Sequence, residues 1–360
     1  MQLTQETVAL YQEKSPELMD AVVQGAEADY VMKRDPVTDY CVKFDAGWCG
    51  IHRDYGADFL GDACHFYPRI TRGVGQTTLT TASLSCPETA RLMLLEADAF
   101  ATAPRTESRV PFSLKQYLPD GMDEAAALAL HQLCLTEAAH ADYSPEENFL
   151  RVQAVGEALA LQPIHQWPEA AAFYFKIAAG RLPAIEPVAT DPFHLLQALH
   201  GLVGASKASA RPRLMRTIAR MEQALGVQLE ATGMQLAPDA AERYLRLVHH
   251  YKQHAAIALS LPLKRYLQAQ LSMAFFPFAG LGETLSERLT IIGVRFATTK
   301  LALMAAALQS GGVPGEDVVV ETVQSLSRFL DHLAEPALSL QIYHEVGWMR
   351  PPRLRAVLME

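Results

Sequence analysis

The chain has 360 residues, which is more than one small domain needs and predicts about two domains. Half of the residues are hydrophobic and 20% are charged, so the disordered and collagen-like classes are excluded. The formal net charge of -9 leaves no basic surplus for general binding to nucleic acid. We therefore expect a folded acidic protein that has no nucleic-acid partner.

The sequence contains no uninterrupted apolar run of the roughly 18 residues that a membrane span requires. The first seven residues, MQLTQET, have neither the basic start nor the apolar stretch of a signal peptide. These features predict a cytoplasmic protein without membrane contact. Because cytosolic thiols stay reduced, a cysteine cluster in such a protein indicates a metal or redox site.

The first hundred residues mix several short elements. A helix is expected over residues 3–26, with Thr4 as its cap and a break at Pro16. The stretch 29–86 is rich in Gly, Asp and Cys. Short β-like runs at 40–44 and 77–84, a short helix at 57–64 and a helix starting at Pro87 complete this part.

From about residue 122 the pattern is helical almost throughout. Helices are expected over 122–141, 145–161, 239–276, 285–309 and 317–343. Pro262 should kink the third of these, and the run GGVPG at 311–315 separates the last two. The sequence therefore predicts a mainly α protein: a small cysteine-rich α+β metal-binding module at 1–100, followed by an α-helical domain at 101–360.

Four of the five cysteines fall close together in the sequence. Cys41, Cys49, Cys64 and Cys86 are separated by seven, fourteen and twenty-one residues, whereas Cys134 lies in an Ala- and Leu-rich helical run that predicts a core position. Four thiolates can hold zinc or an iron–sulfur cluster. The gaps are longer than those of zinc ribbons, so spacing alone leaves open the alternative that these are ordinary buried thiols.

The residues around these cysteines carry a resemblance to a known family. The motif C-x-I-H occurs at 49–52, the motif G-x-x-x-L-x-x-x-C-x-x-Y-P-R at 56–69, and L-S-C-P-E at 84–88, in that order. The run QSLSRFLDH at 324–332 is similar to a late helix of the same family. These pieces resemble the flagellin lysine-N-methylase (FliB) family.

The resemblance implies an enzyme that transfers a methyl group from S-adenosylmethionine to lysine side chains of flagellin. It also implies a cysteine-bound iron–sulfur cluster, with a 4Fe–4S cluster expected and zinc as the other metal considered, on Cys41, Cys49, Cys64 and Cys86. One departure concerns the N-terminus. The family carries a further cysteine-rich run there, ending in a Cys-Cys pair, and Met1 stands after the place where that run is expected.

The candidate catalytic residues follow from the chemistry of the acceptor. A lysine ammonium has a pKa of about 10.4, and only the neutral amine attacks a methyl sulfonium. The enzyme must therefore desolvate the lysine or supply a base. The candidates near the cysteines are His52, Asp62, Tyr67 and Glu88, each with a purely structural alternative: Asp62 as a helix cap, Tyr67 as a packed ring, and Glu88 as a residue favoured by a helix dipole.

Two arginines could hold the carboxylate of the methyl donor. Arg69 and Arg91 are the candidate cofactor-binding residues, although solvation at the surface is the competing interpretation for Arg91. The alternative hypothesis from another functional class is a non-catalytic zinc- or iron-chelating protein whose helical domain binds a partner.

Overall fold

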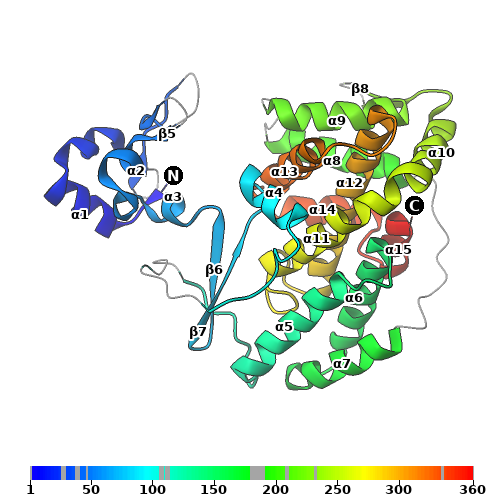
Figure 1. Cartoon of the computed structure of the whole chain (residues 1–360), viewed down its shortest axis with the longest axis horizontal. Helices are drawn as coiled ribbons and strands as arrows, with labels where there is room; N and C mark the ends of the chain where they lie inside the picture. Colours follow the sequence, from blue (N-terminus) through cyan, green and yellow to red (C-terminus); the bar gives the residue numbers. More distant parts are fainter. Residues whose placement is uncertain are drawn as a thin grey trace. The chain divides into compact units, whose positions relative to one another are not determined.

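The computed structural model describes residues 2–25, 30–36, 41–45, 48–104, 109, 114–178, 191–206, 211–230, 233–333 and 336–359. The chain folds as two compact units (Figure 1). The small unit contains residues 1–72 and 104–115, and the large unit contains residues 73–103 and 116–360. The expectation of a mainly α protein is confirmed, because helices make up most of the described chain.

The small unit begins with a three-stranded antiparallel sheet in the order β1-β3-β2. Thr4 caps the first helix by accepting a hydrogen bond from the backbone N–H of Thr7. The helix expected over 3–26 is shorter than predicted, because a 3₁₀ helix opens at Pro16 and a strand follows it. The elements of this part are β1 (Gln2–Leu3), α1 (Gln5–Lys14), η1 (Pro16–Ala21), β2 (Val22–Gln24) and β3 (Tyr30–Met32).

The cysteine-bearing part of the small unit is made of short elements. A two-stranded ribbon leads directly into a one-and-a-half-turn helix, and the 57–64 helix is divided into a 3₁₀ turn and a short α-helix. These elements are β4 (Phe44–Asp45), β5 (Trp48–Cys49), α2 (Gly50–Tyr55), η2 (Ala57–Phe59) and α3 (Asp62–Phe66). The small unit has its own apolar core, in which Tyr11 is fully buried and donates a hydrogen bond to the carbonyl of Phe59 at 2.7 Å.

Helices form most of the large unit. Their bounds are α4 (Pro87–Leu95), α5 (Glu124–Ala138), α6 (Pro145–Leu159), α7 (Trp167–Ala178), α8 (Asp191–Ser206), α9 (Pro212–Leu225), α10 (Ala240–His250), α11 (Ala256–Ala274), α12 (Leu285–Ser310), α13 (Glu316–Leu330), α14 (Pro336–Val346) and α15 (Pro351–Met359). The remaining elements are the 3₁₀ turn η3 (Ile164–Gln166) and two hairpins, β6 (Arg69–Val74) with β7 (Thr77–Ala82), and β8 (Val227–Glu230) with β9 (Gly233–Leu236). Strand β6 crosses the boundary between the two units.

Helix α12 is the central element of the large unit. It packs against α6, α9, α11, α13 and α15, and nearly all of its length is buried. By length and composition α12 could cross a membrane, but 94% of its most apolar window is buried inside the protein, as in the core helix of a helical domain. Its glycine, Gly293, permits close packing, because a Cβ there would lie 2.8 Å from Cζ of Phe149 on α6.

Two of the long predicted helices are interrupted. The 239–276 helix is present, but a π-helix at Tyr251–Ala255 separates α10 from α11, and Pro262 lies inside α11. The 317–343 helix is two helices, α13 and α14, with Asp331 and His332 at the break. The expected breaker after α12 is confirmed, since Gly311 ends the helix at a φ of 69°, a conformation that favours glycine.

Candidate functional site

Three of the four candidate metal ligands belong to the small unit. Cys41, Cys49 and Cys64 are half-buried and pack against the same apolar core. Burial is the largest cause that raises the pKa of the Cys64 thiol, and the nearby thiols of Cys49 and Cys41 raise it further. Burial, and after it the nearby thiols of Cys64, Cys49 and Cys41, raise the pKa of Tyr11 to about 12. The short elements of the small unit therefore bring the three thiols close enough to influence one another electrostatically.

The fourth candidate ligand, Cys86, lies in the large unit as the N-cap residue of α4. Its role as a ligand stays a prediction. Among the described residues, no three His, Cys, Asp or Glu side chains form a group that could hold a metal ion. The thiols of Cys41, Cys49 and Cys64 are soft donors that suit zinc or iron by their chemistry, and their role as ligands likewise stays a prediction.

The predicted catalytic residues also fall into both units. In the small unit His52 lies exposed on α2, and Asp62 starts α3 and forms an ion pair with Arg109. Tyr67 follows α3 and is 48% exposed. Arg69 donates a hydrogen bond to the carbonyl of His65 at 2.8 Å.

In the large unit, Glu88 and Arg91 pair with each other on the surface of α4 at 2.8 Å, and Arg91 also contacts Glu96 at 3.2 Å. The hydrogen bond from Arg91 holds the pKa of Glu88 below its ordinary range. The guanidinium of Arg91 is thus engaged by two carboxylates of its own helix. The structure does not gather the six predicted catalytic and cofactor-binding residues into one cluster within either unit.

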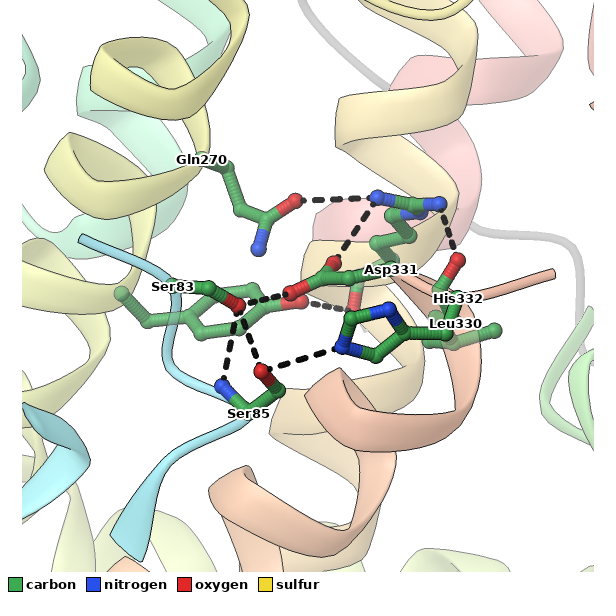
Figure 2. Close-up of polar contacts among 8 residues, drawn as sticks. Ser83, Ser85, Gln270, Leu330, Asp331 and His332 are labelled. Atoms are coloured by element: carbon green, nitrogen blue, oxygen red, sulfur yellow. Dashed lines mark hydrogen bonds and ion pairs between the residues drawn. The ribbon is translucent and has the colours of Figure 1, made fainter. Parts of the chain in front are cut away.

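A buried polar cluster in the large unit joins the L-S-C-P-E motif to the break between α13 and α14 (Figure 2). The Ser83 hydroxyl lies 2.8 Å from Oγ of Ser85 and 3.2 Å from Oδ2 of Asp331. Nε2 of His332 lies 3.2 Å from Oγ of Ser85, and Gln324 donates to the Ser85 carbonyl at 2.7 Å. These contacts fix the backbone immediately before Cys86.

A buried arginine completes this cluster. Arg295, on α12, reaches Oδ1 of Asp331 at 3.1 Å and donates to the carbonyl of Leu330 at 2.6 Å, while Gln270 lies 3.4 Å away. Arg295 and Asp331 are 8% and 6% exposed. Because Ser85 is only 1% exposed, its contact with His332 is closed to a substrate. The cluster therefore serves to position α4 and Cys86 against the domain core.

A second buried ion pair lies at an open pocket of the large unit. Nζ of Lys300, on α12, is 2.7 Å from Oε1 of Glu146, on α6, and 5.7 Å from the ring centre of Tyr251. The surrounding cavity has a volume of about 520 Å³. We call it the Tyr251 pocket; its lining is Ser144, Pro145, Glu146, Tyr251, Lys252, Ala256, Ile257, Ser260 and Lys300.

The chemistry of the Tyr251 pocket follows from local structure. Tyr251 starts the π-helix, a feature that often occurs at functional sites. Burial is the larger cause that raises the pKa of Tyr251, and the nearby Glu146 carboxylate raises it further. The phenol therefore keeps its proton at neutral pH. Burial alone would raise the pKa of Glu146, but Lys300 and local hydrogen bonds hold it below the ordinary value. The pocket lining thus presents one carboxylate, two ammoniums and a neutral phenol, together with apolar side chains.

Glu146→Gln should reduce stability in a pH-dependent manner. At pH 7 the substitution leaves the buried Lys300 without its counter-ion and should cost about 2 kcal/mol. Because the folded pKa of Glu146 is lowered, the ionised carboxylate stabilises the fold above the ordinary glutamate pKa of about 4.3. That contribution is lost as the pH falls through the folded value. Urea unfolding should therefore be measured at pH 7 and at an acidic pH below the ordinary glutamate pKa. The difference in unfolding free energy between wild type and variant should be smaller at the acidic pH. An unchanged difference would contradict this explanation.

Sequence reasoning did not single out Arg295, Glu146, Tyr251 or Lys300. A signal for two of them was present: Arg295 and Lys300 are charged residues inside the otherwise apolar stretch 289–307, where a buried charge requires a partner. The partners themselves come from distant parts of the chain, Asp331 and Glu146, so only the fold identifies them.

Comparison with known proteins gives one family. Residues 165–341 match the FliB lysine N-methylase C-terminal domain, a stretch that includes Tyr251, Arg295, Lys300 and Asp331. No curated protein and no solved structure matched the chain. Through its C-terminal domain, the chain belongs to the FliB lysine N-methylase family.

Proposed function

We propose that this protein is a cytoplasmic S-adenosylmethionine-dependent protein-lysine N-methyltransferase that acts on flagellin. The observation that carries the proposal is the match of residues 165–341 to the FliB lysine N-methylase C-terminal domain. Supporting it, the buried cluster of Ser83, Ser85, Arg295, Asp331 and His332 joins the L-S-C-P-E motif to that same domain. The L-S-C-P-E motif and the matched domain thus belong to one folded unit.

The test is to co-express flagellin with and without the protein and to measure the mass of flagellin. Active enzyme should add mass in steps of one methyl group, and peptide analysis should place each step on a lysine. Purified protein, flagellin and S-adenosylmethionine should reproduce the modification. Unmodified flagellin in the presence of folded, metal-loaded protein would favour the non-catalytic metal-binding alternative.

We place the acceptor lysine in the Tyr251 pocket. Methyl transfer requires a neutral amine: its nitrogen lone pair forms a bond to the methyl carbon, the carbon–sulfur bond breaks, and its electron pair stays on sulfur. The nitrogen then loses one proton to water or a base. The pocket lining holds the two ammoniums of Lys252 and Lys300 against the single carboxylate of Glu146, and this positive surplus disfavours a further positive charge. An entering lysine would therefore have a lowered pKa and a larger neutral fraction.

The Tyr251 phenol can accept a hydrogen bond from the entering amine and orient its lone pair. Ile257 is 94% exposed and Leu261 is 48% exposed, next to the pocket along α11, and they offer apolar contact to the protein substrate around the lysine. The cysteine-bound metal is proposed as part of the small unit, with Cys41, Cys49 and Cys64 as donors. We give this metal a structural role, holding the fold of the small unit on which methylation depends, and no chemical step of methyl transfer.

Tyr251→Phe should lower the methylation rate of flagellin by at least about tenfold, because the amine loses its orienting partner. The ring and its packing remain, so the melting temperature should change little. Tyr343→Phe is the matched control, since Tyr343 is equally buried but does not line the pocket. Equal rates for wild type and Tyr251→Phe would remove the acceptor lysine from this pocket without affecting the assignment of the reaction itself.

A further inference from the structure

A second cavity of the large unit is lined by three arginines. It has a volume of about 320 Å³ and lies among α9, α10 and α12. Arg220 comes from α9, and Arg243 and Arg246 come from α10. We call this cavity the arginine pocket. Its lining contains no carboxylate, although the chain as a whole carries a net charge of -9, and it shares no lining residue with the Tyr251 pocket.

The three guanidinium groups differ in their partners. Arg243 is held by Asp239 at 2.9 Å, and Arg246 makes longer contacts with Asp239 at 3.5 Å and Glu242 at 3.6 Å. These three ion pairs lie at the surface of α10 and its N-cap residue Asp239. By contrast, Nη1 of Arg220 is buried and has no hydrogen-bond partner among the described residues. A buried donor without a partner costs free energy, so its presence at a cavity points to a missing acceptor.

The rest of the lining shows what kind of molecule would fit. Ala224, Ala305 and Leu308 form apolar walls, and Gln223 and Gln309 add two amides. A guanidinium recognises the planar oxygens of a carboxylate or a phosphate, often with two parallel hydrogen bonds. The apolar walls and amides would contact an organic part of the ligand. A cavity of this size belongs to the lower range of small-molecule sites.

We propose that the arginine pocket binds a small organic anion, with the carboxylate or phosphate of the ligand on Arg220 and its apolar part against Leu308. This inference does not depend on the methyltransferase proposal, because it rests only on the lining and on the unpaired donor. It assigns the pocket a ligand-binding role that is separate from the acceptor lysine. Arg243 and Arg246, which both also pair with Asp239, add two further guanidinium groups to the lining.

The experiment uses the full chain and two bare probes, inorganic phosphate and succinate, titrated at constant ionic strength with chloride as the reference anion. Binding is measured by calorimetry and by the rise in melting temperature that a ligand of the folded state produces. At least one probe should bind saturably, and the stronger of the two identifies the ligand as a phosphate or a carboxylate. Arg220→Gln should weaken that probe by about tenfold or more.

The matched control is Arg216→Gln, one turn earlier on the same helix, where Arg216 is exposed and pairs with Glu321 at 3.0 Å outside the pocket. It should bind the probe as wild type does. A second variant, Arg246→Gln, changes a side chain that is 59% exposed and should weaken the probe several-fold. The proposal is overturned if neither probe binds saturably, or if Arg220→Gln and Arg246→Gln bind as tightly as Arg216→Gln.

Discussion

Asp331→Ala should destabilise the large unit by about 4 kcal/mol, the largest stability effect that we expect from one substitution. The change leaves the guanidinium of Arg295 buried beside an empty space, with only carbonyl and amide partners remaining. Ser83 also loses the acceptor that connects it to the end of α13. Urea unfolding followed by circular dichroism would measure the loss as a lower midpoint at an unchanged slope.

The comparison with a surface pair makes this prediction specific. Arg216 and Glu321 lie 3.0 Å apart but are 53% and 29% exposed, so Glu321→Ala should cost well under about 1 kcal/mol. The double variant Arg295→Met with Asp331→Leu should be more stable than Asp331→Ala, because no buried charge is left unpaired. If Asp331→Ala cost no more than Glu321→Ala, the buried cluster would not hold α4 in place.

The long helices of the large unit could be predicted because each carries a sustained apolar pattern and clear end signals. Helix α12 is the best example: Thr284 and Glu287 form a capping box at its start, and Gly311 ends it. The 317–343 helix was predicted as one element because the apolar pattern continues across the break at Asp331. The tertiary contact of Asp331 with Arg295 is a long-range interaction that local periodicity does not contain.

The small unit was harder to predict for a physical reason. Its strands β1 to β5 have two or three residues, too few for an alternating pattern to be recognised, and Val22–Gln24 continues the apolar spacing of the preceding helix. The π-helix at Tyr251–Ala255 likewise leaves the apolar pattern nearly unchanged. The sequence could therefore indicate the α+β character of this part, but it could not give the register of the sheet.

The candidate site shows the same division between local and long-range information. The sequence motifs singled out the cysteines as candidate ligands. In the structure Cys41, Cys49 and Cys64 pack against one apolar core, while Cys86 belongs to the other unit. The residues of the Tyr251 pocket carry no motif that sequence reasoning used. They come together from α6, the π-helix, α11 and α12, which lie far apart in the chain.

Cys64→Ser should abolish both metal binding and flagellin methylation, if the thiols of the small unit hold the proposed metal. A serine hydroxyl is a poor ligand for iron or zinc at neutral pH, because it stays protonated, whereas a thiol becomes a thiolate on binding. Cys64 packs against the core that Cys41 and Cys49 share, so its loss leaves two thiols there. Metal content after anaerobic reconstitution and the mass of co-expressed flagellin are the two measurements.

Two further cysteine variants separate the metal from the reaction. Cys134→Ala removes a fully buried thiol in α5 of the large unit and should leave both metal content and methylation unchanged. Cys86→Ser tests the fourth ligand directly, since a true ligand lost from the set should lower metal content as Cys64→Ser does. Methylation that persists in metal-free Cys64→Ser would show that the large unit carries the reaction alone and that the thiols of the small unit serve another purpose.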